Sequence, residues 1–253
     1  MDFSDKTVIV TGAGSGIGRG FAVGFCRDGA NVAGIGRTRA DLEQTAHLCG
    51  AGKMHFVVGD VSTPEDVERL FSEATQRYGK VDILVNNAAV SPRVAFLEST
   101  HEEWCRVIEI NLLGMALCCR AALPGMLERG FGRIINLGSF AWKRPIANSS
   151  AYSASKGAVR AFTKALAAEI DRNRYPDVLV NELMPGVAKT RMSDSGADPM
   201  SLYVHARFVA SLPRNGPTGE AFVQSTLHIE DYGLRARLKR FVANATGRPA
   251  WKR

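Results

Sequence analysis

The chain has 253 residues, of which 45% are hydrophobic and 23% charged, the balance of a globular protein with a sizeable core. It holds no uninterrupted apolar run of the ~18 residues that a membrane-spanning helix needs, so we expect no membrane partner. The formal net charge is +7, but residues 228–253 carry seven Lys/Arg against two Asp/Glu and account for most of it. Because a basic chain end is usually a solvated segment, this charge does not indicate nucleic-acid binding.

The cysteines and the first residues bear on the compartment. Residues 1–5 are acidic and lead directly into a strand, which argues against a signal or transit peptide. The cysteines are odd in number and lack metal-ligand spacing: Cys26, Cys49, Cys105, Cys118 and Cys119. We therefore expect free thiols, no metal site and a cytoplasmic location.

The predicted elements alternate along the chain. Apolar, β-branched runs predict strands at 7–10, 32–35, 54–58, 83–85, 133–137 and 178–183. Helical spacing predicts helices at 17–28, 40–48, 64–78, 102–128 and 152–170. Pro64 suits a first helical turn behind Ser62 or Thr63, and Pro124 predicts a kink or an end in the long fourth helix.

This alternation predicts an α/β fold, a single-domain Rossmann-type doubly wound parallel sheet with helices on both faces, over residues 1–253. Beyond Pro185 the regular pattern fails, apart from a short strand at 220–223 and a helix near 231–242. Leu234, Leu238 and Phe241 form an apolar stripe on that helix, which we expect to pack on the domain rather than on a partner subunit.

A glycine-rich turn joins the first strand to the first helix. It reads Thr11-Gly12-Ala13-Gly14-Ser15-Gly16-Ile17-Gly18. Glycines between a strand and a helix allow a tight turn and close approach of the backbone to a pyrophosphate, which rests on the helix N-terminus. The turn therefore predicts a dinucleotide site.

The end of the second predicted strand indicates which dinucleotide binds. An acidic residue there would bind the ribose 2′-hydroxyl of NAD, but the chain has Gly36-Arg37-Thr38-Arg39. A guanidinium binds a 2′-phosphate through charge-assisted bonds. We predict NADP(H) in preference to NAD(H), with Arg37 as the main ligand and Arg39 as a second. The alternative is an ordinary solvated arginine.

Tyr152 and Lys156 lie four residues apart in the predicted helix 152–170, so they share one helix face. A fixed cation beside a phenol favours phenolate, which makes tyrosine a usable general acid. The spacing alone is common on solvated helix faces. Its meaning depends on Ser139, thirteen residues before the tyrosine, and on Asn111.

Together with Asn86-Asn87-Ala88-Ala89 after the fourth strand, these motifs closely resemble the short-chain dehydrogenase/reductase family over residues 5–192. The resemblance implies the catalytic residues Asn111, Ser139, Tyr152 and Lys156, with Ser139 and Tyr152 also contacting substrate. It implies cofactor binding by Gly12, Ser15, Gly16, Ile17, Gly18, Arg37, Asp60, Val61, Asn87, Tyr152, Lys156, Pro185, Gly186, Val187 and Thr190.

The implied mechanism is carbonyl reduction. Tyr152 gives its proton to the carbonyl oxygen as hydride arrives from the nicotinamide, and Ser139 hydrogen-bonds the same oxygen. Lys156 binds the nicotinamide ribose, and Asn111 links Lys156 to solvent through its backbone and a water. Each residue has a structural alternative: a loop cap for Ser139, a helix bulge for Asn111 and a surface cation for Lys156.

The chain departs from the family pattern at two places. Ala89 replaces the glycine that usually ends the Asn-Asn-Ala-Gly motif. The C-terminal part lacks the Asp-Gly-Gly of many members, and Gly216-Pro217-Thr218-Gly219 instead resembles the carbonyl-reductase-like branch.

The family's substrate pocket is formed by loops that correspond here to 90–97, 140–148 and a lid at about 188–212. These loops offer aromatic residues for an apolar pocket, or alternatively for the core: Phe96, Phe140, Trp142, Tyr203 and Phe208. We expect an NADPH-dependent reductase of a ketone or aldehyde. A 3-oxoacyl-carrier-protein reductase, docking its acidic carrier on Arg129, Arg172 and Arg174, and an alcohol dehydrogenase are alternatives of the same class.

A non-catalytic NADPH-binding regulator is the alternative from another class. The resemblance also implies a homodimer or homotetramer, paired through the long helices that start near Glu102 and Tyr152.

Overall fold

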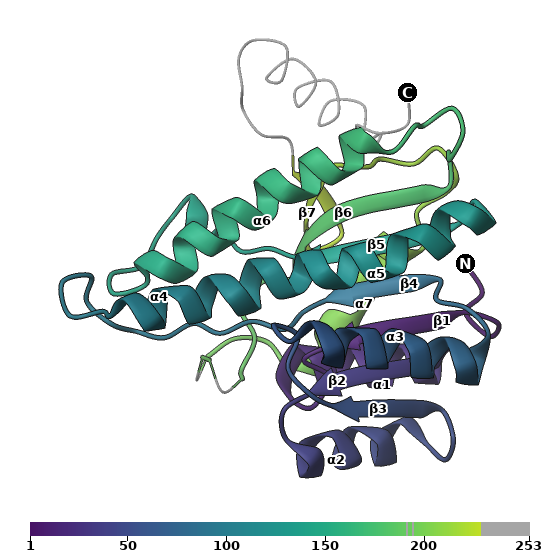
Figure 1. Cartoon of the computed structure of the whole chain (residues 1–253), viewed down its shortest axis with the longest axis horizontal. Coiled ribbons are helices and arrows are strands. Elements are labelled where there is room, and N and C mark those ends of the chain that lie inside the picture. Colours follow the sequence, from purple (N-terminus) through teal and green to yellow (C-terminus); the bar gives the residue numbers. More distant parts are fainter. Residues whose placement is uncertain (191, 194, 229–253) are drawn as a thin grey trace.

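The computed structural model describes residues 1–190, 192, 193 and 195–228. Its centre is one eight-stranded sheet in the order β3-β2-β1-β4-β5-β6-β7-β8. The strands are β1 (Thr7–Thr11), β2 (Asn31–Gly36), β3 (Met54–Val58), β4 (Ile83–Asn86), β5 (Gly132–Leu137), β6 (Val178–Met184), β7 (Ala221–Val223) and β8 (Thr226–His228). The first seven are parallel, which confirms the predicted doubly wound sheet (Figure 1).

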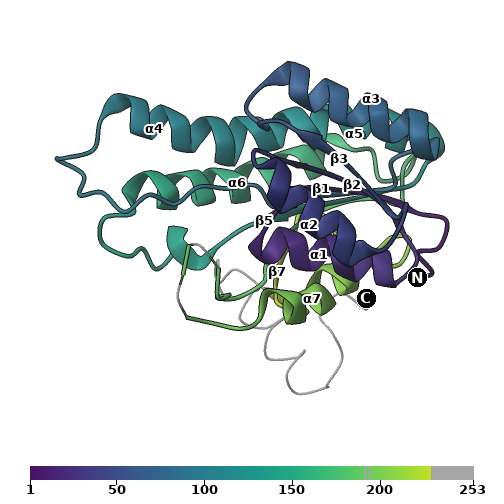
Figure 2. The same cartoon turned by 90° about the horizontal axis from the view of Figure 1, so that it is seen from below.

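The helices are α1 (Gly16–Arg27), α2 (Arg39–Cys49), α3 (Pro64–Tyr78), α4 (His101–Ile108), α5 (Gly114–Arg129), α6 (Ser150–Glu169) and α7 (Tyr203–Ala210). Figure 2 shows α1, α2 and α7 on one face of the sheet and α3, α4, α5 and α6 on the other. Side chains alternate along β1: Val8 and Val10 pack in the core between the sheet and α1, whereas Ile9 packs in the core between the sheet and α3 and α5. Both faces of the sheet are thus covered, as the apolar strands require.

Pro124 neither ends nor divides the long helical region, contrary to one sequence expectation. It lies inside α5 with an exposed side chain. A proline cannot donate a hydrogen bond to the carbonyl of the residue four positions earlier, which here is that of the exposed Arg120. Because the affected carbonyl lies on the exposed side, water can take the place of the missing donor.

The helical stretch His101–Arg129 is long and apolar enough to cross a bilayer when judged by length and composition alone. The structure gives this apolarity another explanation, because Cys118, Cys119, Ala122 and Met126 pack in the core beneath α5. Burial raises the pKa of the Cys118 thiol to about 12, so this cysteine acts as a small apolar residue.

Two elements beyond Pro185 were not predicted from the sequence. The strand β8 pairs antiparallel with β7, which departs from the all-parallel expectation. Helix α7 packs on α1: the ring of Tyr203 contacts that of Phe25 at 4.9 Å between centroids, and its hydroxyl donates to Asp28 at 2.8 Å. The predicted helix near 231–242 and its stripe lie outside the described residues.

Tyr203 and Phe208 therefore belong to the core and not to a substrate wall. Phe208 packs edge-on against the fully buried Phe222, with 6.0 Å between ring centroids. The short, only moderately amphipathic segment around them gave no clear helical signal. In the fold it serves to cover the sheet beside α1.

We predict that Tyr203→Ala lowers the free energy of unfolding by about 3 kcal/mol, because the ring and its hydrogen bond to Asp28 are both lost. Chemical denaturation measures this value. Leu97→Ala is the control, since Leu97 is 95% exposed and its change should stay within about 0.5 kcal/mol. An unaltered stability of the Tyr203 variant would contradict its placement in the core.

Candidate active site

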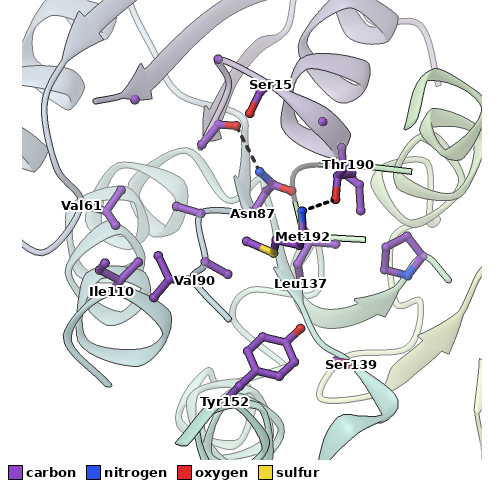
Figure 3. A pocket seen from close by; sticks show the side chains of 18 of the residues that line it. Ser15, Val61, Asn87, Val90, Ile110, Leu137, Ser139, Tyr152, Thr190 and Met192 are labelled. Carbon is purple, nitrogen blue, oxygen red and sulfur yellow. Dashed lines mark hydrogen bonds between the residues drawn. The ribbon is translucent and has the colours of Figure 1, made fainter. Parts of the chain in front are cut away.

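The carboxyl ends of the parallel strands open into one cavity of about 410 Å³. Its size falls within the usual range for small-molecule sites, and its walls include the ends of β2, β5 and β6 and the loops that follow the six strands β1 to β6. Of the residues predicted to be catalytic or to bind the cofactor, all but Gly18, Arg39 and Asn111 line this cavity. Figure 3 shows the ring of Tyr152 pointing from α6 into the cavity on the side where Ser139 lies.

The glycine turn is shaped for close backbone approach. Gly12 has a φ of +66°, which favours glycine. A Cβ on Gly18 would lie 2.8 Å from the carbonyl carbon of Gly12, so Gly18 supports the turn from behind and does not face the cavity. Ser15 precedes α1 without capping it by its side chain. The first N–H groups of α1 thus have no side-chain cap and suit the pyrophosphate of a dinucleotide.

Asn87 braces this turn from the neighbouring strand. Its backbone N–H donates to Thr11 Oγ1 at 3.0 Å, and its Nδ2 donates to the Thr11 carbonyl at 2.9 Å. The preceding Asn86 points the other way: it is buried and donates to Asn136 Oδ1 at 2.9 Å. The structure therefore separates the pair into a cavity residue and a core residue.

Arg37 and Arg39 differ in position at the end of β2. Arg37 lines the cavity, is exposed, and makes no ion pair or hydrogen bond within the described part of the chain. Arg39 does not line the cavity; its guanidinium lies 3.8 Å from Glu43, one turn along α2. Thr38 and Asp41 also line this end and were not predicted as site residues. Asp41 lies 3.9 Å from Arg19, so its charge is partly balanced.

Asp60 follows β3 at the same end of the cavity. It accepts hydrogen bonds from the backbone N–H and hydroxyl of Ser62 at 3.0 and 2.7 Å, and it pairs with Arg106 on α4. Partial burial acts to raise the pKa of Asp60, but these hydrogen bonds and the ion pair outweigh it and leave the pKa below its usual value. Asp60 is therefore ionised at neutral pH and fixes the loop that carries Val61.

Lys156 is a buried cation at the base of the cavity. The residue is only 4% exposed, and its Nζ donates to the Leu137 carbonyl at 2.7 Å. The same ammonium lies 5.7 Å from the centroid of the Tyr152 ring. The i, i+4 spacing thus brings both side chains to one face of α6, as the sequence indicated.

Ser139 lies two residues after the end of β5 and caps the short helical turn Phe140–Trp142. Its Oγ accepts from the backbone N–H of Ala141 at 3.1 Å. Since Oγ acts here as an acceptor, its own O–H remains a donor for an oxygen atom in the cavity. The cap and the donor role are therefore compatible, although the sequence presented them as alternatives.

Asn111 has a bracing role and does not reach the cavity. It sits in a π-helical turn, Glu109–Leu113, between α4 and α5. Its carboxamide accepts from Val90 N at 2.8 Å and donates to Val90 O at 2.9 Å and to Ser155 Oγ at 3.0 Å. It thus ties the loop after β4 to α6, beside Lys156. Such π-turns often mark functional sites.

Of the five aromatic residues that the pocket loops offered, only Phe140 lines the cavity. Trp142 lies against Gly157 of α6, and Phe96 packs edge-on against Trp104 at 6.0 Å in a separate apolar groove. The cavity lining also includes the aliphatic side chains of Val90, Met184 and Met192. These residues follow predicted strands in the chain, but their residue types did not indicate whether they line a cavity or belong to the core.

The protein family described as "short chain dehydrogenase" matches residues 6–200 of this chain. The chain therefore belongs to the short-chain dehydrogenase/reductase family, whose members use NAD(H) or NADP(H) and act on small molecules, typically as oligomers. It is an oxidoreductase of that family.

Relatives and solved structures agree with this assignment. A 3β-hydroxysteroid dehydrogenase of Mediterraneibacter gnavus is 36% identical over 215 residues, covering 78% of this chain and 77% of its own. An uncharacterised oxidoreductase of Staphylococcus aureus is 33% identical over 190 residues, covering 75% and 81%. The structure of a 3-ketoacyl-(acyl-carrier-protein) reductase from Brucella melitensis, complexed with NADH, has a TM-score of 0.80 and 31% identity, covering 86% and 96%.

We predict that Asn111→Asp lowers the free energy of unfolding by about 1–3 kcal/mol, because a carboxylate oxygen would face the Val90 carbonyl in place of an N–H donor. Denaturation of the purified variant measures the loss. Asn173→Asp is the control, since Asn173 is exposed and should shift stability by less than about 0.5 kcal/mol. Equal stability of both variants would show that the bracing by Asn111 is unimportant.

Proposed function

We propose that the protein is an NADPH-dependent reductase of a ketone or aldehyde. The observation that carries this proposal is the convergence of Ser139 and Tyr152 on one cavity, above a buried lysine. The glycine turn and the uncapped start of α1 fit a dinucleotide in the same cavity. A binding protein without catalysis would need the turn but not the serine, tyrosine and lysine together.

Each residue has a role in the proposed reaction. NADPH supplies a hydride from C4 of its nicotinamide. Ser139 donates a hydrogen bond to the substrate oxygen and stabilises the negative charge that develops there. Tyr152 gives its proton to that oxygen, and Lys156 stabilises the resulting phenolate and holds the nicotinamide ribose. Asn111 positions the lysine's helix through Ser155, while the π-turn offers a backbone route for proton exchange with solvent.

The preference for NADPH rests on charge at the end of β2. Arg37 reaches the cavity without a carboxylate partner among the described residues, and the segment Gly36-Arg37-Thr38-Arg39 at the end of β2 contains no acidic residue. The similar reductase from Brucella melitensis was solved with NADH, so the family accommodates either form. In this chain Arg37 favours the form that carries a 2′-phosphate.

The substrate that fits the cavity is largely apolar. Phe140, Val90, Met184 and Met192 line the same cavity as Tyr152 and supply apolar surface for such a substrate. Similar proteins act on a steroid alcohol and on 3-ketoacyl groups, according to their names. A 3-oxoacyl substrate is the second candidate, and the reverse reaction, alcohol oxidation, is open to the same site when the cofactor is oxidised.

Two of the arginines suggested for docking an acidic carrier have other partners. Arg129 donates to the Val81 carbonyl at 2.5 Å, and Arg172 donates to the Gly216 carbonyl at 3.0 Å. Each bond occupies an N–H donor that would otherwise be open to a carboxylate of a carrier protein. A small-molecule carbonyl is therefore the favoured substrate.

The proposed assembly is a homodimer or homotetramer. An apolar groove on the outer side of α4 is lined by Phe96, Trp104, Ile108 and Leu113, of which Phe96 and Leu113 are 64% and 52% exposed. Pairing of such surfaces between two copies would bury them. All five cysteines are free thiols, which supports a cytoplasmic location.

We predict that Tyr152→Phe lowers kcat by about 100-fold or more, because the proton donor is lost while the ring remains. The dissociation constant for NADPH, measured by fluorescence, should change by less than about twofold. Tyr175→Phe is the matched control and should retain full turnover. A Tyr152 variant that keeps roughly a tenth of the wild-type kcat would contradict the general-acid role.

We further predict that Arg37→Asp raises KM for NADPH by about 10-fold or more, since a charge-assisted bond to the phosphate is replaced by repulsion. KM for NADH should change much less. Arg39→Asp serves as the control because Arg39 does not line the cavity. An unchanged KM for NADPH in the Arg37 variant would refute the assignment.

A further inference from the structure

Glu182 is a carboxylate in the interior of the sheet. It lies in β6, where every residue is buried, and it is itself 0% exposed. Burying a carboxylate in a central parallel strand is costly unless it is paired. Neither the cofactor site nor the proposed proton transfer uses this residue, so its presence needs a separate explanation.

The charge of Glu182 is balanced by Arg160. The Nε of Arg160 lies 3.5 Å from Oε2 of Glu182, and their side chains are 7% and 0% exposed. Arg160 sits on α6 one turn after Lys156, and its Nη1 also donates to the Gly219 carbonyl at 2.9 Å. The ion pair therefore connects the helix that carries Tyr152 and Lys156 to the sheet.

The other side of Glu182 packs against Gly138. A Cβ on Gly138 would lie 2.5 Å from Cδ of Glu182 and 2.6 Å from Cγ, so the carboxylate fills the space that a side chain would need. Gly138 stands between Leu137, whose carbonyl accepts from Lys156, and Ser139. The backbone that delivers the serine thus rests on the Glu182 side chain.

We infer that Glu182 is a positioning residue for the proposed reaction: packed beneath Gly138 and paired with Arg160, it sets Ser139 at a fixed distance from Tyr152. The inference rests on the proposed function for its catalytic consequence only. The serine comes from a strand end and the tyrosine from a helix, and two such elements need a common support to hold a reacting carbonyl between them. Glu182 contacts the backbone of the first and is tied to the second.

The test compares Glu182→Gln, Glu182→Ala, Gly138→Ala and the double variant Gly138→Ala/Glu182→Ala. The first readout is hydrogen exchange of the amides of residues 138–142, which requires no substrate. Loss of the support in Glu182→Ala should speed this exchange by about tenfold or more. The second readout is kcat, which is measured together with the dissociation constant for NADPH.

We expect Glu182→Ala and Gly138→Ala each to lower kcat by about tenfold or more, with NADPH affinity changed by less than about twofold. Glu182→Gln keeps the shape of the side chain and should be the mildest variant. In the double variant the added methyl group enters the space left by the carboxylate, so its kcat should be well above the product of the two single effects.

The matched control is Arg133→Met. Arg133 is 2% exposed and pairs with the partly exposed Asp177 at 2.6 Å, so it belongs to a second ion pair, between β5 and the chain entering β6, at the opposite end of these strands. This variant should lose stability but keep kcat and the slow exchange of residues 138–142. A purely structural role for Glu182 would make its variants behave in the same way, and that result would overturn the inference.

The two proposals fail separately. If the wild-type protein oxidises NADPH with no carbonyl compound, the proposed function is wrong, while hydrogen exchange still decides whether Glu182 supports residues 138–142. If the wild type is active and the Glu182 variants match Arg133→Met in both readouts, only the positioning role is wrong. Multiplicative effects in the double variant would likewise contradict the contact between Gly138 and Glu182.

Discussion

The ammonium of Lys156 is buried against the carbonyl of Leu137, at the end of the strand that also delivers Ser139. A buried ammonium is tolerated only where its hydrogen bonds are satisfied, so this contact fixes the first turns of α6 relative to β5. Tyr152 lies on the same helix face and is placed by the same contact. The geometry of the proposed reaction therefore depends on one helix–strand junction.

The surrounding structure holds this junction on several sides. The π-turn presents Asn111 to Val90 and Ser155, which joins the loop after β4 to α6. Asn136, one residue before Leu137, is buried and donates to Thr163 on α6 at 3.0 Å. Glu182 and Arg160 act from the β6 side. Buried polar groups that are hydrogen-bonded or paired with an opposite charge favour one arrangement of the elements around them.

The alternating sheet and most of the cavity residues were predictable from the sequence. The glycines are identified by the backbone shape that a tight turn requires, and Tyr152 and Lys156 by their spacing. Both features can be read from the sequence. The bracing of Asn111 was not visible, because it depends on a π-turn and on Val90, which lies 21 positions away. The sequence left Tyr203 open between the substrate pocket and the core, because the position of a short segment with little regular pattern is decided only by its packing on α1. The role of Glu182 was not predictable, because the sequence does not indicate that this single carboxylate in an apolar strand contacts Arg160 and Gly138.

The parallel sheet explains how residues that follow six strands reach one site. Strand ends that meet at one edge bring the glycine turn, Arg37, Asp60, Asn87, Ser139 and Pro185 to a single cavity. In the proposed reaction the turn and Arg37 would hold the cofactor, Lys156 would hold its nicotinamide ribose, and Ser139 and Tyr152 would face the substrate oxygen. Family membership gives the class of chemistry, and the proposed apolar substrate rests on the aliphatic residues that line the cavity.

The most direct measurement is deuterium transfer from NADPH carrying deuterium in both C4 positions to a panel of apolar ketones, followed by mass spectrometry of the product. The account predicts one deuterium on the new carbinol carbon for each NADPH oxidised, and no transfer by the Tyr152→Phe variant. Tight binding of NADPH without deuterium in any product would contradict it and would favour a non-catalytic role for the site.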